Sequence, residues 1–91
     1  MISVEVYADR NRVRDLNDLR NGMRNYPMMK CQLPFLPQPG DNFYPSEGWA
    51  GMSVLRREVT GNTDVITLIV DGNSWDLNVL KQAGFSIKLG E

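Results

Sequence analysis

The strongest constraint on the fold lies in residues 52–71, where two runs rich in apolar and β-branched residues flank the dipeptide Gly61-Asn62. A Gly-Asn pair between two such runs is a strong sequence signal for a β-hairpin with a two-residue turn. A turn at this pair sets the register of the hairpin, with cross-strand pairs Leu55–Leu68, Val54–Ile69 and Arg57–Ile66.

Both faces of this hairpin are predicted to be largely apolar. One face carries Leu55, Val59, Ile66, Leu68 and Val70, and the other carries Met52, Val54, Val65 and Ile69 together with Arg56 and Glu58. A hairpin with two apolar faces must be covered on both sides, so we expect it to be a central element of a sheet and not an edge.

Further strands are predicted on either side of the hairpin. Residues 2–8 and 26–33 alternate in polarity with period two, and shorter extended runs occur near Phe43 and at residues 86–89. Three prolines within residues 34–39 exclude a helix or a central strand there, and Phe35 and Leu36 are expected to be buried anchors of this loop.

Two short helices are predicted. In residues 9–25 apolar residues recur at spacings near three and four, which is typical of an amphipathic helix; they are Val13, Leu16, Leu19 and Met23. The second helix is expected to begin after an N-cap at Asn73 or Ser74 and to end at Gly84, with Phe85 in contact with Leu80.

Size and charge narrow the function classes. The chain has 91 residues, which predicts one domain over 1–91, and its ten basic and eleven acidic residues give a net charge of −1. That balance supports neither a general affinity for nucleic acid nor one for membrane surfaces. No apolar run reaches the roughly 18 residues of a membrane span, and no signal-peptide pattern is present. The single cysteine, Cys31, cannot form an internal disulfide, which fits a reducing cytoplasm or indifference to the redox compartment, and we expect a cytoplasmic location.

Catalytic and metal chemistry find little support in the sequence. The chain has no histidine, which removes the commonest general base and metal ligand. Cys31 therefore has no imidazole to activate it and is interpreted as a small core residue. We predict no enzyme activity, no cofactor and no metal site.

The best candidate for a binding site combines aromatic residues with arginines. Tyr44 and Trp49 precede the hairpin strand that carries Arg56 and Arg57. Aromatic rings beside arginines can hold single-stranded nucleic acid or side chains of a partner protein. Phe43 is interpreted as core and Trp49 as either core or site, and Arg56 and Arg57 should point to opposite faces of the sheet.

Residues 9–25 contain half of the basic residues of the chain. Arg12, Arg14 and Arg20 are the candidate contacts to nucleic acid in this segment, since arginine suits phosphate groups. Asp9, Asp15 and Asp18 dilute the local positive field, so a solvated face of mixed charge is the preferred interpretation.

Residues 33–70 carry a resemblance to a known group of proteins. The run Leu33-Pro34-Phe35-Leu36-Pro37, then Pro39-Gly40-Asp41, then Gly51-Met52-Ser53-Val54 and the hairpin, resembles small SH3-like β-barrel proteins. Those proteins are encoded by short bacterial reading frames, including cargo of mobile gene cassettes. The resemblance implies a small barrel and a bacterial source, and it implies no activity because such proteins share none.

The sequence therefore predicts an α+β, β-rich fold, either a small SH3-like barrel or a curled antiparallel sheet of about five strands with two short helices. The first functional hypothesis is a non-enzymatic binding module that forms a homo-oligomer, most simply a dimer, because the chain has more apolar surface than it can cover. The expected interface residues are Val13, Leu16, Leu19, Met23 and Trp75. The alternatives are nucleic-acid binding through residues 9–25 and a small-molecule pocket at the aromatic turn, residues 43–49.

Overall fold

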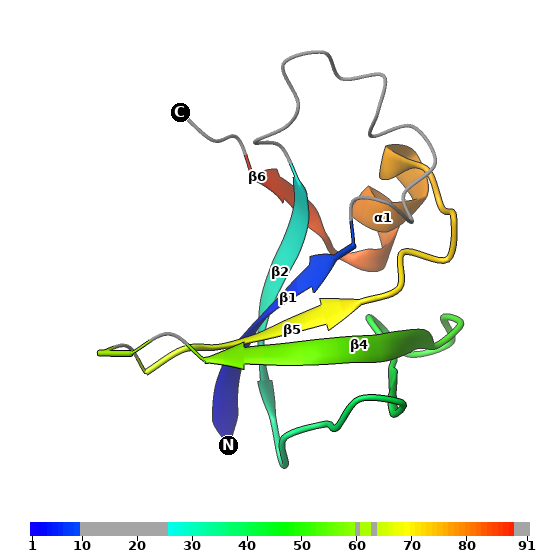
Figure 1. Ribbon diagram of the computed structural model, residues 1–91. Helices are drawn as coiled ribbons and strands as arrows, with labels where there is room; N and C mark the ends of the chain where they lie inside the picture. Colours follow the sequence, from blue (N-terminus) through cyan, green and yellow to red (C-terminus); the bar gives the residue numbers. More distant parts are fainter. Residues whose placement is uncertain (10–25, 60, 63, 89–91) are drawn as a thin grey trace.

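The computed structural model describes residues 1–9, 26–59, 61–62 and 64–88 (Figure 1). The first predicted helix, apart from Asp9, lies outside the described residues. Six strands and one helix are present in the described part: β1 (Ile2–Ala8), β2 (Tyr26–Leu33), β3 (Asn42–Phe43), β4 (Met52–Val59), β5 (Ile66–Val70), α1 (Leu77–Ala83) and β6 (Ser86–Lys88).

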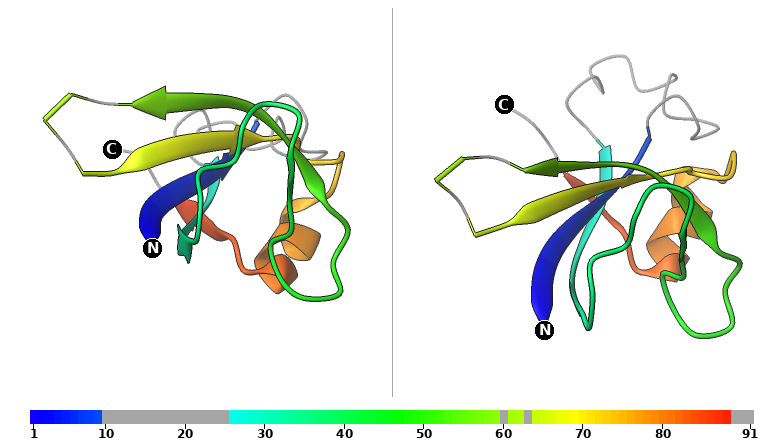
Figure 2. Two further views of the ribbon diagram at one scale, coloured as in Figure 1. Left: turned by 90° about the horizontal axis from the view of Figure 1, so that it is seen from below. Right: turned by 60° about the horizontal axis from the view of Figure 1, so that its bottom comes forward.

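The strands form one strongly curled sheet in the order β3-β4-β5-β1-β2-β6 (Figure 1). Both views of Figure 2 place α1 and the loop between β3 and β4 on the same side of β4 and β5. We call this the concave face, and the opposite side the outer face. The predicted β-rich curled sheet of about five strands is confirmed, with the two-residue β3 as a short addition beside β4.

The sheet is mixed, because β1 runs parallel to β5 while the other pairs are antiparallel. The bounds predicted for β1 and β2 are confirmed, and so is the separation of their side chains into two faces. Period-two alternation is the same for parallel and antiparallel strands, so it could not reveal that β1 enters between β5 and β2.

The register predicted for the hairpin is wrong. Leu68 lies opposite Arg57, and Val54 lies opposite Val70. The pairing shifts by one residue between Val54 and Arg56, so Leu55 is an extra residue, a β-bulge, in β4. In addition, six residues separate β4 from β5 although Gly61 and Asn62 do form a turn, with Asn62 at φ 67°.

The bulge changes which side chains of β4 are buried. Met52 and Val54, predicted to lie on the face opposite Leu68 and Val70, are 0% and 1% exposed and belong to the same core as these two residues. Val59, expected to be covered because it belongs to an apolar face of the hairpin, is 74% exposed. The core on the concave face consists of Val4, Val6, Ala8, Phe43, Met52, Val54, Leu68, Val70, Leu80, Ala83 and Phe85.

The loop after β2 differs in part from expectation. Phe43 is buried as predicted, and Leu36 packs against the core. Phe35 was predicted to be a buried anchor but is 65% exposed, whereas Pro37 is buried. Proline removes the backbone donor and fixes the chain direction, but it does not determine which neighbouring side chain turns inward.

Helix α1 begins at a different residue from the predicted one. Asp76 is the N-cap, and its carboxylate accepts the N–H of Val79 at 2.9 Å. Asn73 and Ser74 instead form a turn with φ of 57° and 59°. The predicted C-terminal end is confirmed, since Gly84 is left-handed at φ 115° and its N–H donates to carbonyls of the last turn.

The corrected register can be tested with two valines of the same strand. Val54→Ala removes two buried methyl groups, so we expect it to lower the free energy of unfolding by about 2 kcal/mol. Val59→Ala should change it by no more than about 0.5 kcal/mol, because this side chain is in solvent. Urea denaturation of the two variants measures both values, and equal losses would contradict the observed register.

The N-cap of α1 can be tested in the same way. Asp76→Ala removes the acceptor for the first turn and should cost about 1 kcal/mol of stability in thermal or urea unfolding. Ser74→Ala serves as the matched control and should stay within about 0.5 kcal/mol. A larger loss of stability in Ser74→Ala than in Asp76→Ala would contradict the N-cap at Asp76 and favour Ser74, the position predicted from the sequence.

Candidate interaction surface

The outer edge of β4 is covered only at its beginning. β3 pairs with Met52 and Ser53, the first two residues of the strand. At Val54 the loop between β2 and β3 pairs with this edge in place of β3. The Val54 N–H donates to Asp41 O and the Gly40 N–H donates to Val54 O, both at 2.8 Å. Among the described residues no strand or loop pairs with the outer edge of β4 beyond Val54.

The direction of the free backbone groups follows from the neighbouring strands. The Val70 carbonyl points toward β1, where it accepts the N–H of Asp9 at 2.8 Å. Backbone direction alternates along a strand, so Ile69, opposite Arg56, directs its N–H and C=O toward β4. On β4 the same alternation leaves Arg57 and Val59 with their N–H and C=O directed away from the sheet.

This free edge, residues 55–59, runs along the side of β4 that faces away from β5, just before the projecting turn of the hairpin (Figures 1 and 2). Val59 is 74% exposed there, and Arg56, Arg57 and Glu58 are also exposed. An unpaired strand edge presents donors and acceptors that another strand can bind. We call residues 55–59 the open edge.

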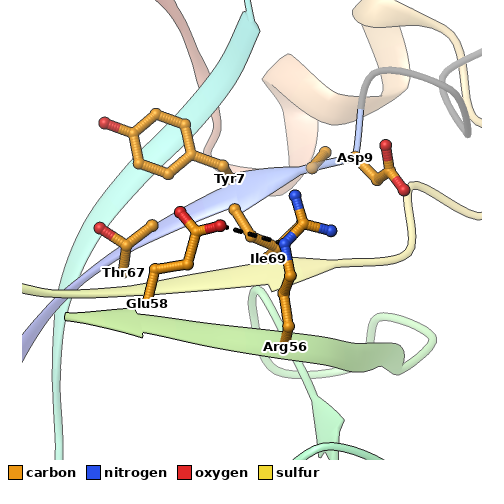
Figure 3. Close-up of a pocket in the computed structure, with 7 residues that line it drawn as sticks. Tyr7, Asp9, Arg56, Glu58, Thr67 and Ile69 are labelled. Atoms are coloured by element: carbon orange, nitrogen blue, oxygen red, sulfur yellow. Dashed lines mark hydrogen bonds and ion pairs between the residues drawn. The ribbon is translucent and has the colours of Figure 1, made fainter.

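Charges on the open edge are divided between the two faces, as predicted for Arg56 and Arg57. Arg56 lies on the outer face, where its Nε is 3.1 Å from Glu58 Oε2 (Figure 3). Their side chains are 57% and 54% exposed, so this ion pair contributes little to folding stability. Arg57 is opposite Leu68 on the concave side, and no ion pair to another described residue is formed by it.

The Arg56–Glu58 pair borders a shallow cavity of about 340 Å³ on the outer face (Figure 3). Ile69 and Thr67 of β5 and Tyr7 of β1 also line it. The Tyr7 hydroxyl donates to Glu5 Oε1 at 2.8 Å, which fixes the ring beside the cavity. The lining contains the two carboxylates of Asp9 and Glu58 and the guanidinium of Arg56. Its charge therefore does not favour an anionic ligand.

A second hollow of about 440 Å³ lies where the loop after β2 meets the end of β3, lined by Leu33, Pro34, Phe35, Pro37, Asp41, Asn42, Phe43 and Tyr44. We call it the aromatic groove, because Phe35 and Tyr44 are 65% and 59% exposed. The Tyr44 ring packs closely against Gly51, where a Cβ would lie only 3.2 Å from the ring. Among the described residues of the lining, Asp41 alone is charged.

The four residues predicted as a binding group are not brought together. Tyr44 lines the aromatic groove, whereas Trp49 is half-buried and packs edge-on against Trp75 with ring centroids 5.7 Å apart. Arg56 and Arg57 lie on opposite faces of the open edge. Sequence reasoning missed Phe35 as a groove residue, because Pro34 and Pro37 do not determine whether Phe35 or Leu36 turns outward.

The other candidate residues have mixed positions. Trp75, expected at an oligomer interface, is half-buried against Trp49. The remaining predicted interface and nucleic-acid residues lie outside the described residues: Val13, Leu16, Leu19, Met23, Arg12, Arg14 and Arg20.

The described residues show little that suggests catalysis. Cys31 is half-buried, and burial raises the pKa of its thiol, which disfavours the nucleophilic thiolate. No group of three histidine, cysteine, aspartate or glutamate residues that could hold a metal ion occurs in the described part of the chain. Within that same part, no helix is long and apolar enough to cross a bilayer.

Comparison of the chain with models of protein families, with curated proteins and with solved structures gave no match. The structural evidence for function is therefore the open edge of β4, the cavity beside it and the aromatic groove.

Proposed function

We propose that this protein is a non-enzymatic interaction module that works as a homo-oligomer, formed by adding a second strand to the open edge of β4. The observation that carries this proposal is the outward direction of the Arg57 and Val59 backbone groups, next to the exposed Val59 side chain. A strand added there would satisfy these groups and extend the sheet by one strand.

The size of the open edge sets the expected strength. Within the described part of β4 the open edge is limited to residues 55–59, because Gly40 and Asp41 occupy the edge at Val54. A pair of such short strands buries less than the roughly 1,200 Å² of a standard stable interface. We therefore expect a weak dimer, with a dissociation constant on the order of 100 µM.

Arg57→Pro tests the proposal. Proline removes the outward N–H and places its ring on the edge, and it leaves the bonds between β4 and β5 at Arg56 and Glu58 in place. Sedimentation of the wild-type chain from about 10 µM to about 1 mM should show a dimer whose fraction rises with concentration. The proline variant should remain a monomer over the same range.

Arg57→Gln is the matched control, since it changes the same side chain and keeps the N–H. It should still associate, and circular dichroism should show that both variants are folded. A wild-type chain that stays monomeric, or a proline variant that associates as the wild type does, would refute this function.

The aromatic groove supports a second candidate function, the binding of a ligand with an apolar body and a positive charge. Two exposed rings, Phe35 and Tyr44, can each attract a cation through the ring face. Asp41 adds a carboxylate, of which Oδ2 accepts the Gln38 N–H at 2.8 Å. A lysine or arginine side chain within an extended apolar peptide has this combination of properties.

The peptide acetyl-Leu-Arg-Leu-amide, with acetyl-Leu-Glu-Leu-amide as its control, tests the groove. In an NMR titration we expect the arginine peptide to shift signals of Phe35, Asp41 and Tyr44, and the glutamate peptide to shift none of them. Asp41→Asn should weaken binding by roughly threefold to tenfold, the size of one exposed charge interaction. Equal shifts with both peptides, or shifts elsewhere, would exclude this use of the groove.

A further inference from the structure

We infer that two copies of the chain pair β4 with β4 in antiparallel fashion about a two-fold axis at Arg57, so that Arg56 of each copy lies opposite Glu58 of the other. This inference rests on the proposed function, because it names the partner and the register for the same open edge. It also assigns Arg56 and Glu58 as the residues that determine which strand is accepted.

The limits of the open edge place the axis. At one end Val54 is already bonded to Gly40 and Asp41, and at the other end the chain turns at Gly61 and Asn62. Between these limits no described residue pairs with the edge of residues 55–59, and Arg57 is the middle residue of this segment. Two antiparallel strands that share a two-fold axis at their middle residue use the whole of this length on both copies.

The backbone of Arg57 suits this position. Its N–H and C=O point away from β5, so two copies at the axis can exchange two reciprocal N–H···O bonds. Arg56 and Glu58 direct their backbone groups toward β5 and therefore form the closely spaced pairs on either side of the axis. In such pairs the Cα atoms are about 4.5 Å apart, and opposite side chains interact strongly.

The charges of the outer face match in this register. Arg56 and Glu58 already form an ion pair within one chain, with 3.1 Å between Nε and Oε2. A second copy turned by 180° places its Glu58 beside the first Arg56 and its Arg56 beside the first Glu58. Four charges of alternating sign then lie together, and each carboxylate has a guanidinium on two sides.

The neighbouring two-fold register, with its axis at Glu58, lacks this match. It places the two Glu58 carboxylates directly opposite each other and forms no new pair of opposite charges between Arg56 and Glu58. The Arg57 register also has one repulsive pair, the two Arg57 side chains on the concave side. The Arg57 register has two attractive Arg56–Glu58 pairs and this single repulsive pair. Cross-strand charge pairs have interaction energies of similar size, so attraction exceeds repulsion in this register.

Charge reversal tests the register. Arg56→Glu and Glu58→Arg each place like charges in both outer-face pairs, so each variant alone should dimerise at least tenfold more weakly than the wild type. An equimolar mixture should form a heterodimer with an affinity within about threefold of the wild-type homodimer, because both pairs are then attractive. Isotope or fluorophore labels on one variant identify the heterodimer in sedimentation.

The doubly substituted chain, Arg56→Glu with Glu58→Arg, is the control for changing the native residues at these two positions, because it exchanges the two charges and keeps both. It keeps the pair within each chain and both pairs between copies, so it should dimerise like the wild type. Both positions are exposed, and circular dichroism of each variant confirms that the fold is retained.

Arg57→Gln separates the two registers. It removes the one repulsive pair of the Arg57 register, so we expect the dimer to tighten by roughly threefold or more, and more at low salt. The Glu58 register has no Arg57–Arg57 pair, so it predicts no such gain. Association that depends on the Arg57 N–H but shows neither heterodimer rescue nor tightening would overturn this inference and leave the proposed function standing. Absence of any association would overturn both.

Discussion

The β-bulge at Leu55 decides how the two halves of β4 are used. Before the bulge, Met52 and Val54 face the concave side and are almost completely buried against Leu68 and Val70. After it, the alternation is shifted by one residue, so Arg56 and Glu58 lie on the outer face and Val59 extends into solvent. Without the extra residue, Met52 and Val54 would lie on the same face of the strand as Arg56 and Glu58. A single inserted residue thus separates a core segment of β4 from its open edge.

The loop after β2 marks the boundary between these segments on the sheet edge. Its residues Gly40 and Asp41 satisfy the outward groups of Val54, and the backbone of the loop is held by the Asp41 carboxylate, which accepts the Gln38 N–H. Natural proteins usually protect a sheet edge with charges, short strands or a covering loop. Here the loop covers the edge as far as Val54, and three charged residues occupy the remainder. Arg57, on the concave side, would limit uncontrolled strand addition, whereas Arg56 and Glu58 would favour one partner.

The cavity beside β4 and the aromatic groove suit different chemistry. The cavity beside β4 has hydroxyl, carboxylate and guanidinium groups around Ile69. Two of its charged residues, Arg56 and Glu58, form an ion pair with each other. The aromatic groove is apolar apart from Asp41 and has rigid proline walls, so it is the better place for a small cationic and apolar ligand. The open edge and the groove use different residues, and they can therefore act independently.

Sequence alone determined the features that depend on near neighbours in the chain. Period-two alternation located β1 and β2 with their correct bounds, and Gly84 marked the end of α1 because a left-handed residue there needs no Cβ. Tertiary structure decided the parallel pairing of β1 with β5, the bulge at Leu55 and the exposure of Phe35, and with them the candidate site. The period-two pattern of a strand is the same whether its neighbour runs parallel or antiparallel, and it does not change when the pairing register shifts. Only the packing of distant segments could therefore select among these arrangements.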